Sequence, residues 1–267
     1  MVVSAVVAAA GLVVTFRPGL LAPPGALVEE AVAPVVDAVS SDPYAGSPAA
    51  DYADGIAGFV LPEARAMGGL SRKDVAKGLE RVRDLLAAAY LDRRTLEGGD
   101  PDAFVAALDR DQRRTFSLDP GADGLGREAV NSFAPGTAVP ATDVVKVKGE
   151  ITLGTFHEDG LRGVEVKLNH LVVYAVHRPG QPRTVIRVVT HPTGRVLLHR
   201  DGGRLVAWVS DWGASATPAR CDTDDGYIHP VYDDLPPGTV APTGVPHDPY
   251  VLDEEPFDEG CRASQET

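Results

Sequence analysis

The clearest pattern along the chain is a helical spacing of apolar residues that begins near residue 71. Ser71 and Asp74 have the form of a capping box, which satisfies free backbone N–H groups at the start of a helix. Apolar residues then recur at intervals of three and four, at positions 75, 79, 82, 86 and 89. A short helical turn is expected over 91–97, and a second helix begins at Asp100-Pro101. The pattern therefore predicts two to three helices.

After Asp143 the apolar period changes from 3.6 to 2, which indicates strands. The longest predicted strand covers 164–176. Its second face changes from polar residues to Leu171, Val173 and Ala175, so we expect its second half to be buried on both sides. Further strands are expected over 145–153, 184–190, 195–200 and 204–212, with a loop over 119–141 and turns near 158–160, 191–194 and 201–203.

Helices followed by antiparallel strands predict an α+β fold, because no alternation of strands and helices appears. We expect two to three helices and then a curved antiparallel sheet of about five strands. From residue 218 onward prolines interrupt every periodic pattern, so the rest of the chain is expected to be an irregular tail. At 267 residues and 44% hydrophobic composition, the chain is long and apolar enough to bury a sizeable core.

The N-terminal segment is apolar on all sides. Residues 2–16 contain no charge and are followed by Arg17-Pro18. A membrane-spanning helix needs about 20 apolar residues, so this run is a few short. Either the true start lies upstream or Leu20 and Leu21 complete the helix, and we favour the first interpretation. The alternative is a buried helix, but a Pro-rich stretch directly after the run makes a poor start to a globular domain.

These features predict four regions. Residues 1–21 form an uncleaved membrane anchor, truncated at its start in the favoured interpretation, and the Pro-, Gly- and Ala-rich residues 22–70 form a spacer. Residues 71–217 form the α+β domain, and residues 218–267 form an acidic tail. The expected location is the cell membrane, with a single-pass anchor and the bulk of the chain outside the cytoplasm.

Charge and cysteine content agree with this placement. The net charge is −13, and the segment from Asp222 to Thr267 carries −11 of it, from twelve acidic residues and Arg262. The remainder is nearly neutral and has no cluster of Lys and Arg, which excludes nucleic acid as a partner. Cys221 and Cys261 are the only cysteines, and in an oxidising compartment they would close a 41-residue loop. Such a disulfide stabilises a protein by about 4 kcal/mol in the chain-entropy model.

The order of elements resembles the NTF2-like cone fold found in membrane-anchored and secreted proteins of high-GC bacteria. The resemblance covers about 71–217 and rests on the segments 85–96 and 164–176. It implies a curved sheet wrapped around an interior that some members use as a cavity. It does not imply one activity, because NTF2-like domains include isomerases, cyclases, hydratases and non-enzymatic assembly modules.

His170 is the main catalytic candidate, since it replaces an apolar residue on the inward face of the long strand. In a cone interior this is where an acid or base would stand. Tyr174 and Trp208 are candidates to line the same pocket. The competing interpretation treats all three as core residues, because aromatic side chains on a sheet face are usually packed inside.

Other chemical motifs are weak. The run from Asp222 to Gly226 resembles the start of a calcium loop, with Asp222, Asp224 and Asp233 as candidate ligands, but its glycine is at the wrong position and no flanking helices are predicted. No nucleophile motif and no phosphate-binding glycine loop is present. No cofactor is expected.

The sequence therefore favours a non-enzymatic binding or assembly module, anchored in the membrane by its N-terminus, with an extracytoplasmic protein as its partner. The alternative is a small-molecule enzyme or binder that uses a cone cavity near His170. An open pocket with a carboxylate or tyrosine beside His170 would favour the alternative, and a filled interior would oppose it.

Overall fold

The computed structural model describes residues 42–119, 124–158, 160–233, 243–252 and 262–267. The chain divides into two compact units, Met1–Val39 and Ser40–Thr267. The first unit, with the predicted anchor, lies outside the described residues. Among the residues that are described, no helix is both long and apolar enough to cross a membrane.

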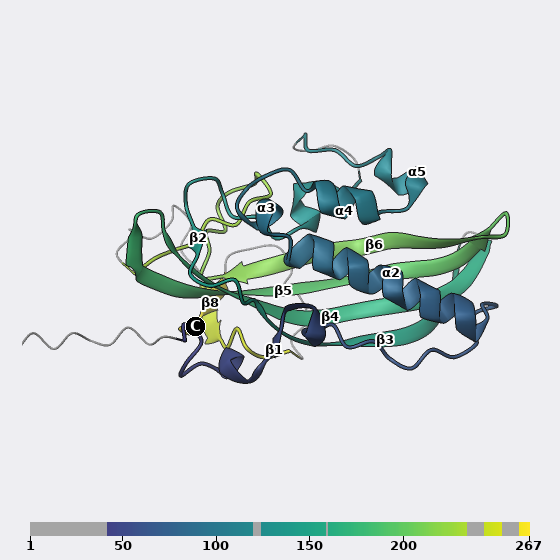
Figure 1. Ribbon diagram of the computed structural model, residues 1–267, viewed down its shortest axis with the longest axis horizontal. Coiled ribbons are helices and arrows are strands. Elements are labelled where there is room, and N and C mark those ends of the chain that lie inside the picture. Colours follow the sequence, from purple (N-terminus) through teal and green to yellow (C-terminus); the bar gives the residue numbers. More distant parts are fainter. Residues whose placement is uncertain (1–41, 120–123, 159, 234–242, 253–261) are drawn as a thin grey trace, which may run out of the picture. The chain divides into compact units, whose positions relative to one another are not determined.

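Four long antiparallel strands, joined by hairpins, form the body of the second unit (Figure 1). Two short strands extend the sheet, one beside β3 and one beside the end of β4. The sheet is open, and its order is β1-β3-β4-β5-β6, with β2 paired to β4. The α+β prediction is confirmed. The strands are β1 (Ala53–Asp54), β2 (Val139–Pro140), β3 (Lys146–Glu158), β4 (Leu161–Arg178), β5 (Gln181–Asp201) and β6 (Arg204–Thr217).

The two strands expected over 184–190 and 195–200 are one continuous strand, β5, and the turn predicted at 191–194 is wrong. The sheet takes up the irregularity with a bulge on β6, where one extra residue lies opposite Gly194. Asp211 at the bulge has a φ of 47°. Gly194 allows the close approach, because a Cβ there would lie 2.8 Å from the carbonyl oxygen of Asp211.

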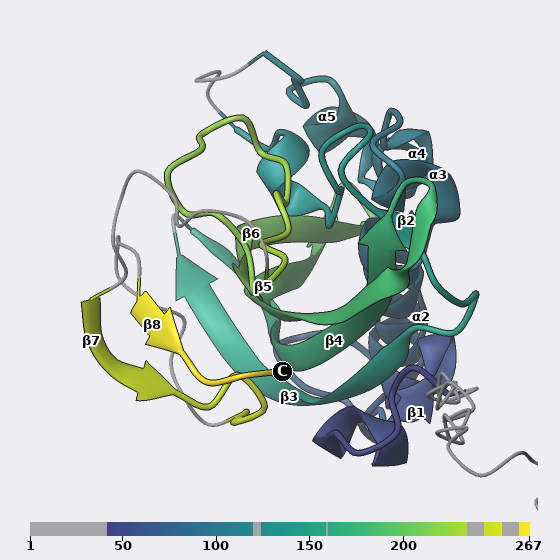
Figure 2. The same ribbon diagram turned by 90° about the vertical axis from the view of Figure 1, so that its left-hand side faces the viewer.

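One long helix, α2 (Arg72–Tyr90), lies across one face of the sheet, which we call the inner face (Figures 1 and 2). The predicted capping box at its start is present: the Ser71 hydroxyl accepts a hydrogen bond from the backbone of Asp74, and the Asp74 carboxylate accepts one from the backbone of Ser71. The predicted apolar stripe of this helix faces the main core. Three short helices follow: α3 (Arg93–Leu96), α4 (Asp102–Ala107) and α5 (Arg110–Arg113).

The opposite, outer face of β4 carries a second apolar cluster, as its sequence pattern predicts. Leu171, Val173 and Ala175 are buried there under Tyr44 and Tyr52, together with parts of the C-terminal segment. Residues 42–70 are therefore not a spacer, as the sequence pattern suggested, but a folded part of the unit, with the 3-10 turns η2 (Pro48–Asp51) and η3 (Gly55–Gly58). Their Pro, Gly and Ser content prevents long helices without preventing packing.

The Tyr44 side chain fastens this outer segment to the sheet. Its hydroxyl donates a hydrogen bond of 2.6 Å to the Val144 carbonyl and accepts one of 3.2 Å from the backbone N–H of Ala175. Burial raises the pKa of Tyr44 to about 12. Lys146 continues the attachment with a 2.7 Å ion pair to Asp54 of β1.

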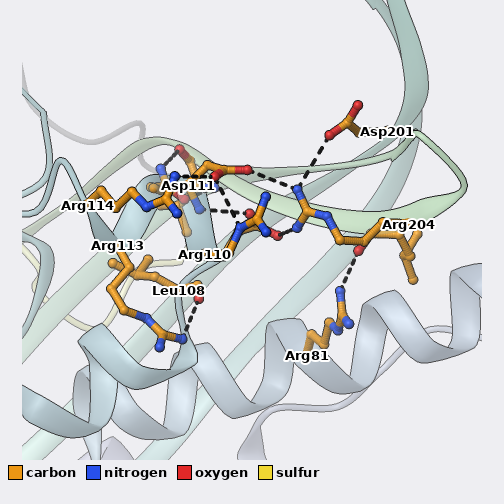
Figure 3. A network of polar contacts seen from close by, with 12 residues as sticks. Arg81, Leu108, Arg110, Asp111, Arg113, Arg114, Asp201 and Arg204 are labelled. Atoms are coloured by element: carbon orange, nitrogen blue, oxygen red, sulfur yellow. Dashed lines mark hydrogen bonds and ion pairs between the residues drawn. The ribbon is translucent and has the colours of Figure 1, made fainter.

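The free edge of β6 is protected by side chains from the helices. The Gln112 amide donates to the Val209 carbonyl at 2.7 Å and accepts from the Val209 N–H at 2.9 Å, in the place of a neighbouring strand. Arg81 donates to the Leu205 carbonyl at 2.7 Å. Figure 3 shows the charged network around this edge, in which Arg204 pairs with Asp109 at 2.5 Å and with Asp111 at 3.1 Å.

The tail is more ordered than its prolines suggested. Ile228 donates to the Ser132 carbonyl at 2.8 Å and accepts from the backbone of Ala134 at 2.9 Å. The loop predicted over 119–141 thus carries buried residues and the 3-10 turn η4 (Arg127–Ala129). Farther on, β7 (Thr243–His247) and β8 (Arg262–Ser264) form a small parallel pair. The expectation of a wholly irregular tail is wrong, because parallel pairing joins segments that no local pattern connects.

Close contact between β4 and β5 leads to a test of the packing. A Cβ at Gly163 would lie 2.0 Å from the backbone oxygen of Leu198. Gly163→Ala is expected to lower the free energy of unfolding by about 3 kcal/mol, the upper end of overpacking costs. Gly154→Ala, on the same hairpin, meets only the flexible Glu165 carboxylate at 3.1 Å and is expected to be tolerated. Urea denaturation measures both, and equal stabilities would contradict this packing.

Candidate functional site

His170 lies on the inner face of β4, as predicted, but it has no catalytic surroundings. Its side chain is fully buried, and neither ring nitrogen has a hydrogen-bond partner within the described part of the chain. The ring packs edge-on against Phe59, with centroids 5.2 Å apart. Burial, with a smaller contribution from the neighbouring His191, lowers the pKa of His170 to about 4. The residue is therefore neutral and enclosed near pH 7.

Tyr174 and Trp208 do not complete a pocket with His170. Tyr174 is buried on the inner face, where its hydroxyl accepts a 2.8 Å hydrogen bond from the Asn131 amide and donates one of 2.9 Å to the Tyr90 carbonyl. Trp208 is 36% exposed and lies on the outer face of β6, because the neighbouring Ala207 and Val209 face the core. The structure therefore does not bring the three candidates together in one pocket.

The three calcium candidates do not come together as ligands. In the described part of the chain, no group of three or more His, Cys, Asp or Glu side chains is placed to hold a metal ion. The Asp222 carboxylate instead takes two hydrogen bonds of 2.8 Å from the Arg220 guanidinium. Asp224 and Asp233 belong to no such group. Cys261 lies outside the described residues, so the disulfide with Cys221 stays a prediction.

A partly open cavity of about 580 Å³ lies at the end of β6. We call it the edge cavity. One wall is the C-terminal end of β6, residues 214–217. Another wall is the segment 219–231, which loops over this end of the sheet (Figure 2). Residues from β7 and β8 close a third side. Polar and charged side chains in its lining include Glu128, Asn131, Ser215, Asp224, Tyr227 and His247.

The charge of the edge cavity is negative. Glu128 and Asp224 have no ion pair with another described residue. Arg220 also lines the cavity, but its charge is compensated by the bidentate contact with Asp222. A cationic group is therefore favoured in this cavity over an anionic one.

A second cavity, of about 270 Å³, adjoins the network in Figure 3 and is lined by Arg81, Asp109, Arg110 and Arg204, among others. Arg204 and Arg110 are paired with Asp109 and Asp111. Because these charges are already matched to one another, the network is suited to joining α5 to β6. The edge cavity is therefore the better candidate for a ligand.

Comparisons with protein-family models, with curated proteins and with solved structures find no match to this chain.

Most residues of the edge cavity were not predicted as site residues. Asp224 was a candidate for calcium only, and Ser215 and His247 were not candidates at all. One available signal was the run of small residues 213–216 at the end of a predicted strand. Small side chains at the end of a strand leave space beside the backbone.

The enclosed histidine leads to a prediction about acid stability. The unfolded chain binds a proton at the ordinary pKa of 6.5, whereas the native pKa is about 4. Acid therefore favours the unfolded state between those values, at a cost of about 3 kcal/mol. His170→Leu is expected to lose that part of the pH dependence in urea denaturation between pH 7.5 and 4. The exposed His157→Asn is the control, and a variant at position 170 that follows the wild-type curve would contradict the assignment.

Proposed function

We propose that this protein is a membrane-anchored binding or assembly module outside the cytoplasm, without catalytic activity, and that its partner binds in the edge cavity. The observation that carries the proposal is the contrast between the two sites. The interior candidate, His170, is enclosed and has no hydrogen-bond partner among the described residues, whereas the edge cavity is polar, charged and large enough for part of a ligand.

The enzyme alternative has less support. A general acid or base must reach the proton that it transfers, directly or through one water. Within the described residues, His170 has no carboxylate or tyrosine within hydrogen-bond reach, and it lines neither the edge cavity nor the second cavity. We also propose that the unit is a divergent relative of the NTF2-like cone fold, on the order of its helices and strands.

The proposed location rests on the sequence: the apolar run 2–16 and the pair of cysteines. Native protein is expected to release no alkylatable thiol until reductant is added, and protease added outside intact spheroplasts is expected to digest the unit 40–267. Two free thiols together with protease resistance would count against an extracytoplasmic position. A cytosolic protein carrying the same tag is the control for spheroplast integrity.

Photo-crosslinking in living cells tests the binding module. A benzophenone amino acid replaces Tyr227, which lines the edge cavity. It is expected to form a defined covalent adduct with a partner, because the partner lies against this side chain. The same photoreactive residue at Trp208, on the outer face of β6, is the control and is expected to form none.

A second substitution shows whether the adduct depends on the cavity. Ala214→Trp places a large side chain in the lining, so it is expected to abolish the adduct at position 227 while the protein level stays unchanged. Absence of any adduct at position 227, or an adduct that persists with Trp at position 214, would contradict the proposal.

A further inference from the structure

Among the described residues, one stretch of the β6 backbone that lines the edge cavity has no backbone partner on its outward side. Neighbouring residues of an antiparallel strand direct their N–H and C=O groups to opposite sides. Val209 directs both groups away from β5, since both are bonded to the Gln112 side chain. Val209 lies opposite Val196, so the backbone groups of Val196 also point away from the other strand. The N–H and C=O groups of the odd-numbered residues 195, 193, 191 and 189 of β5 therefore point toward β6.

The bulge then decides which residues of β6 face outward. Beyond it, Thr193 lies opposite Gly213 and His191 opposite Ser215, so these residues of β6 face β5. Ala214 and Ala216 consequently direct their N–H and C=O groups away from β5, toward the edge cavity that both residues line. No backbone hydrogen bond joins either of them to another described segment outside the sheet.

We infer that the edge cavity binds an extended, basic peptide segment of the partner protein, which adds to the sheet as a strand beside Ala214 and Ala216. A chain added to an exposed sheet edge obtains its affinity from main-chain hydrogen bonds and its specificity from pockets for alternate side chains. Ala214 and Ala216, whose outward donors and acceptors have no partner in the described part of the chain, provide up to four such bonds. The small side chains of both alanines leave the space that a strand at the usual spacing of about 4.8 Å requires.

The charge of the cavity selects the peptide. Glu128 and Asp224 are uncompensated by any described cation, whereas Arg220 is held by Asp222. A peptide with Lys or Arg at alternate positions would direct these side chains to one face, toward the carboxylates. This inference rests on the proposed function and adds the chemical class of the ligand and its mode of binding.

N-methylated peptides test the strand addition. The probe is acetyl-Ala-Lys-Ala-Lys-Ala-amide, titrated calorimetrically into the full-length chain in detergent at low salt. One derivative carries N-methyl groups on both lysines, and the other carries them on the three alanines. Because only alternate N–H groups of an added strand face its neighbour, one derivative is expected to bind at least tenfold more weakly, while the other retains the affinity of the parent.

Substitutions provide a second, independent measurement. Ala216→Pro removes the outward N–H without removing a donor to β5, which an edge strand tolerates. It is expected to weaken binding of the parent peptide at least tenfold, whereas Trp208→Ala, on the same strand outside the cavity, is expected to change nothing. Asp224→Asn is expected to weaken binding severalfold and to reduce its dependence on salt.

The outcomes separate this inference from the function on which it rests. Equal binding of both methylated derivatives, or no binding of the basic peptide by the wild-type chain, overturns strand addition. Preference for the matching Glu peptide over the Lys peptide overturns the assigned charge class. None of these results removes the photo-crosslink expected at position 227, so the proposed binding module stands or falls by that separate measurement.

Discussion

The burial of β4 on both faces is the constraint on which the rest of the unit depends. Val172, Tyr174 and Val176 point toward the helices, while Leu171, Val173 and Ala175 point the opposite way. No antiparallel sheet can leave such a strand half in water, since each buried apolar side chain stabilises the fold by about 1.5 to 3 kcal/mol. Both faces of the strand must therefore be covered. The helices cover the inner face, and the segment that contains Tyr44 and Tyr52, with part of the C-terminal segment, covers the outer face. Where the outer face becomes polar, Glu165 and Arg195 pair across the strands and no cover is needed.

Local patterns predicted the fold class and the order of the helices and strands, because an apolar period of 3.6 or 2 can be recognised from residues that are close in the sequence. They failed where distant residues decide. Tyr44 and Tyr52 are isolated aromatic residues in a Pro-, Gly- and Ser-rich stretch, and only the apolar outer face of β4 explains their position. Pro192 and Gly194 have the composition of a turn, yet strands on both sides hold them extended. The pairing of β7 with β8 joins segments with no shared signal.

The candidate site illustrates the same limit. Alternation along β4 correctly placed His170 inside, but it carried no information on whether an acid or a base would lie beside it. The edge cavity, by contrast, is made from four separate segments and from backbone groups of two alanines, which have no chemical signature in a sequence. What a sequence shows best are side chains with distinctive chemistry. Sites that use main-chain hydrogen bonds are correspondingly hard to find without coordinates.

The bulge at Asp211 divides one strand edge into two parts with different uses. Before it, the Leu205 carbonyl is bonded to Arg81 and both outward groups of Val209 are bonded to Gln112, so side chains from the helices cover that part of the edge. After it, the added residue shifts the phase, and the outward positions pass to Ala214 and Ala216. Loss or gain of one residue here would move the side chains of 213–217, the part of β6 after the bulge, to the opposite faces of the sheet. A substitution along this strand leaves that phase unchanged, whereas an insertion or deletion near Asp211 moves the outward backbone groups from one set of residues to the other.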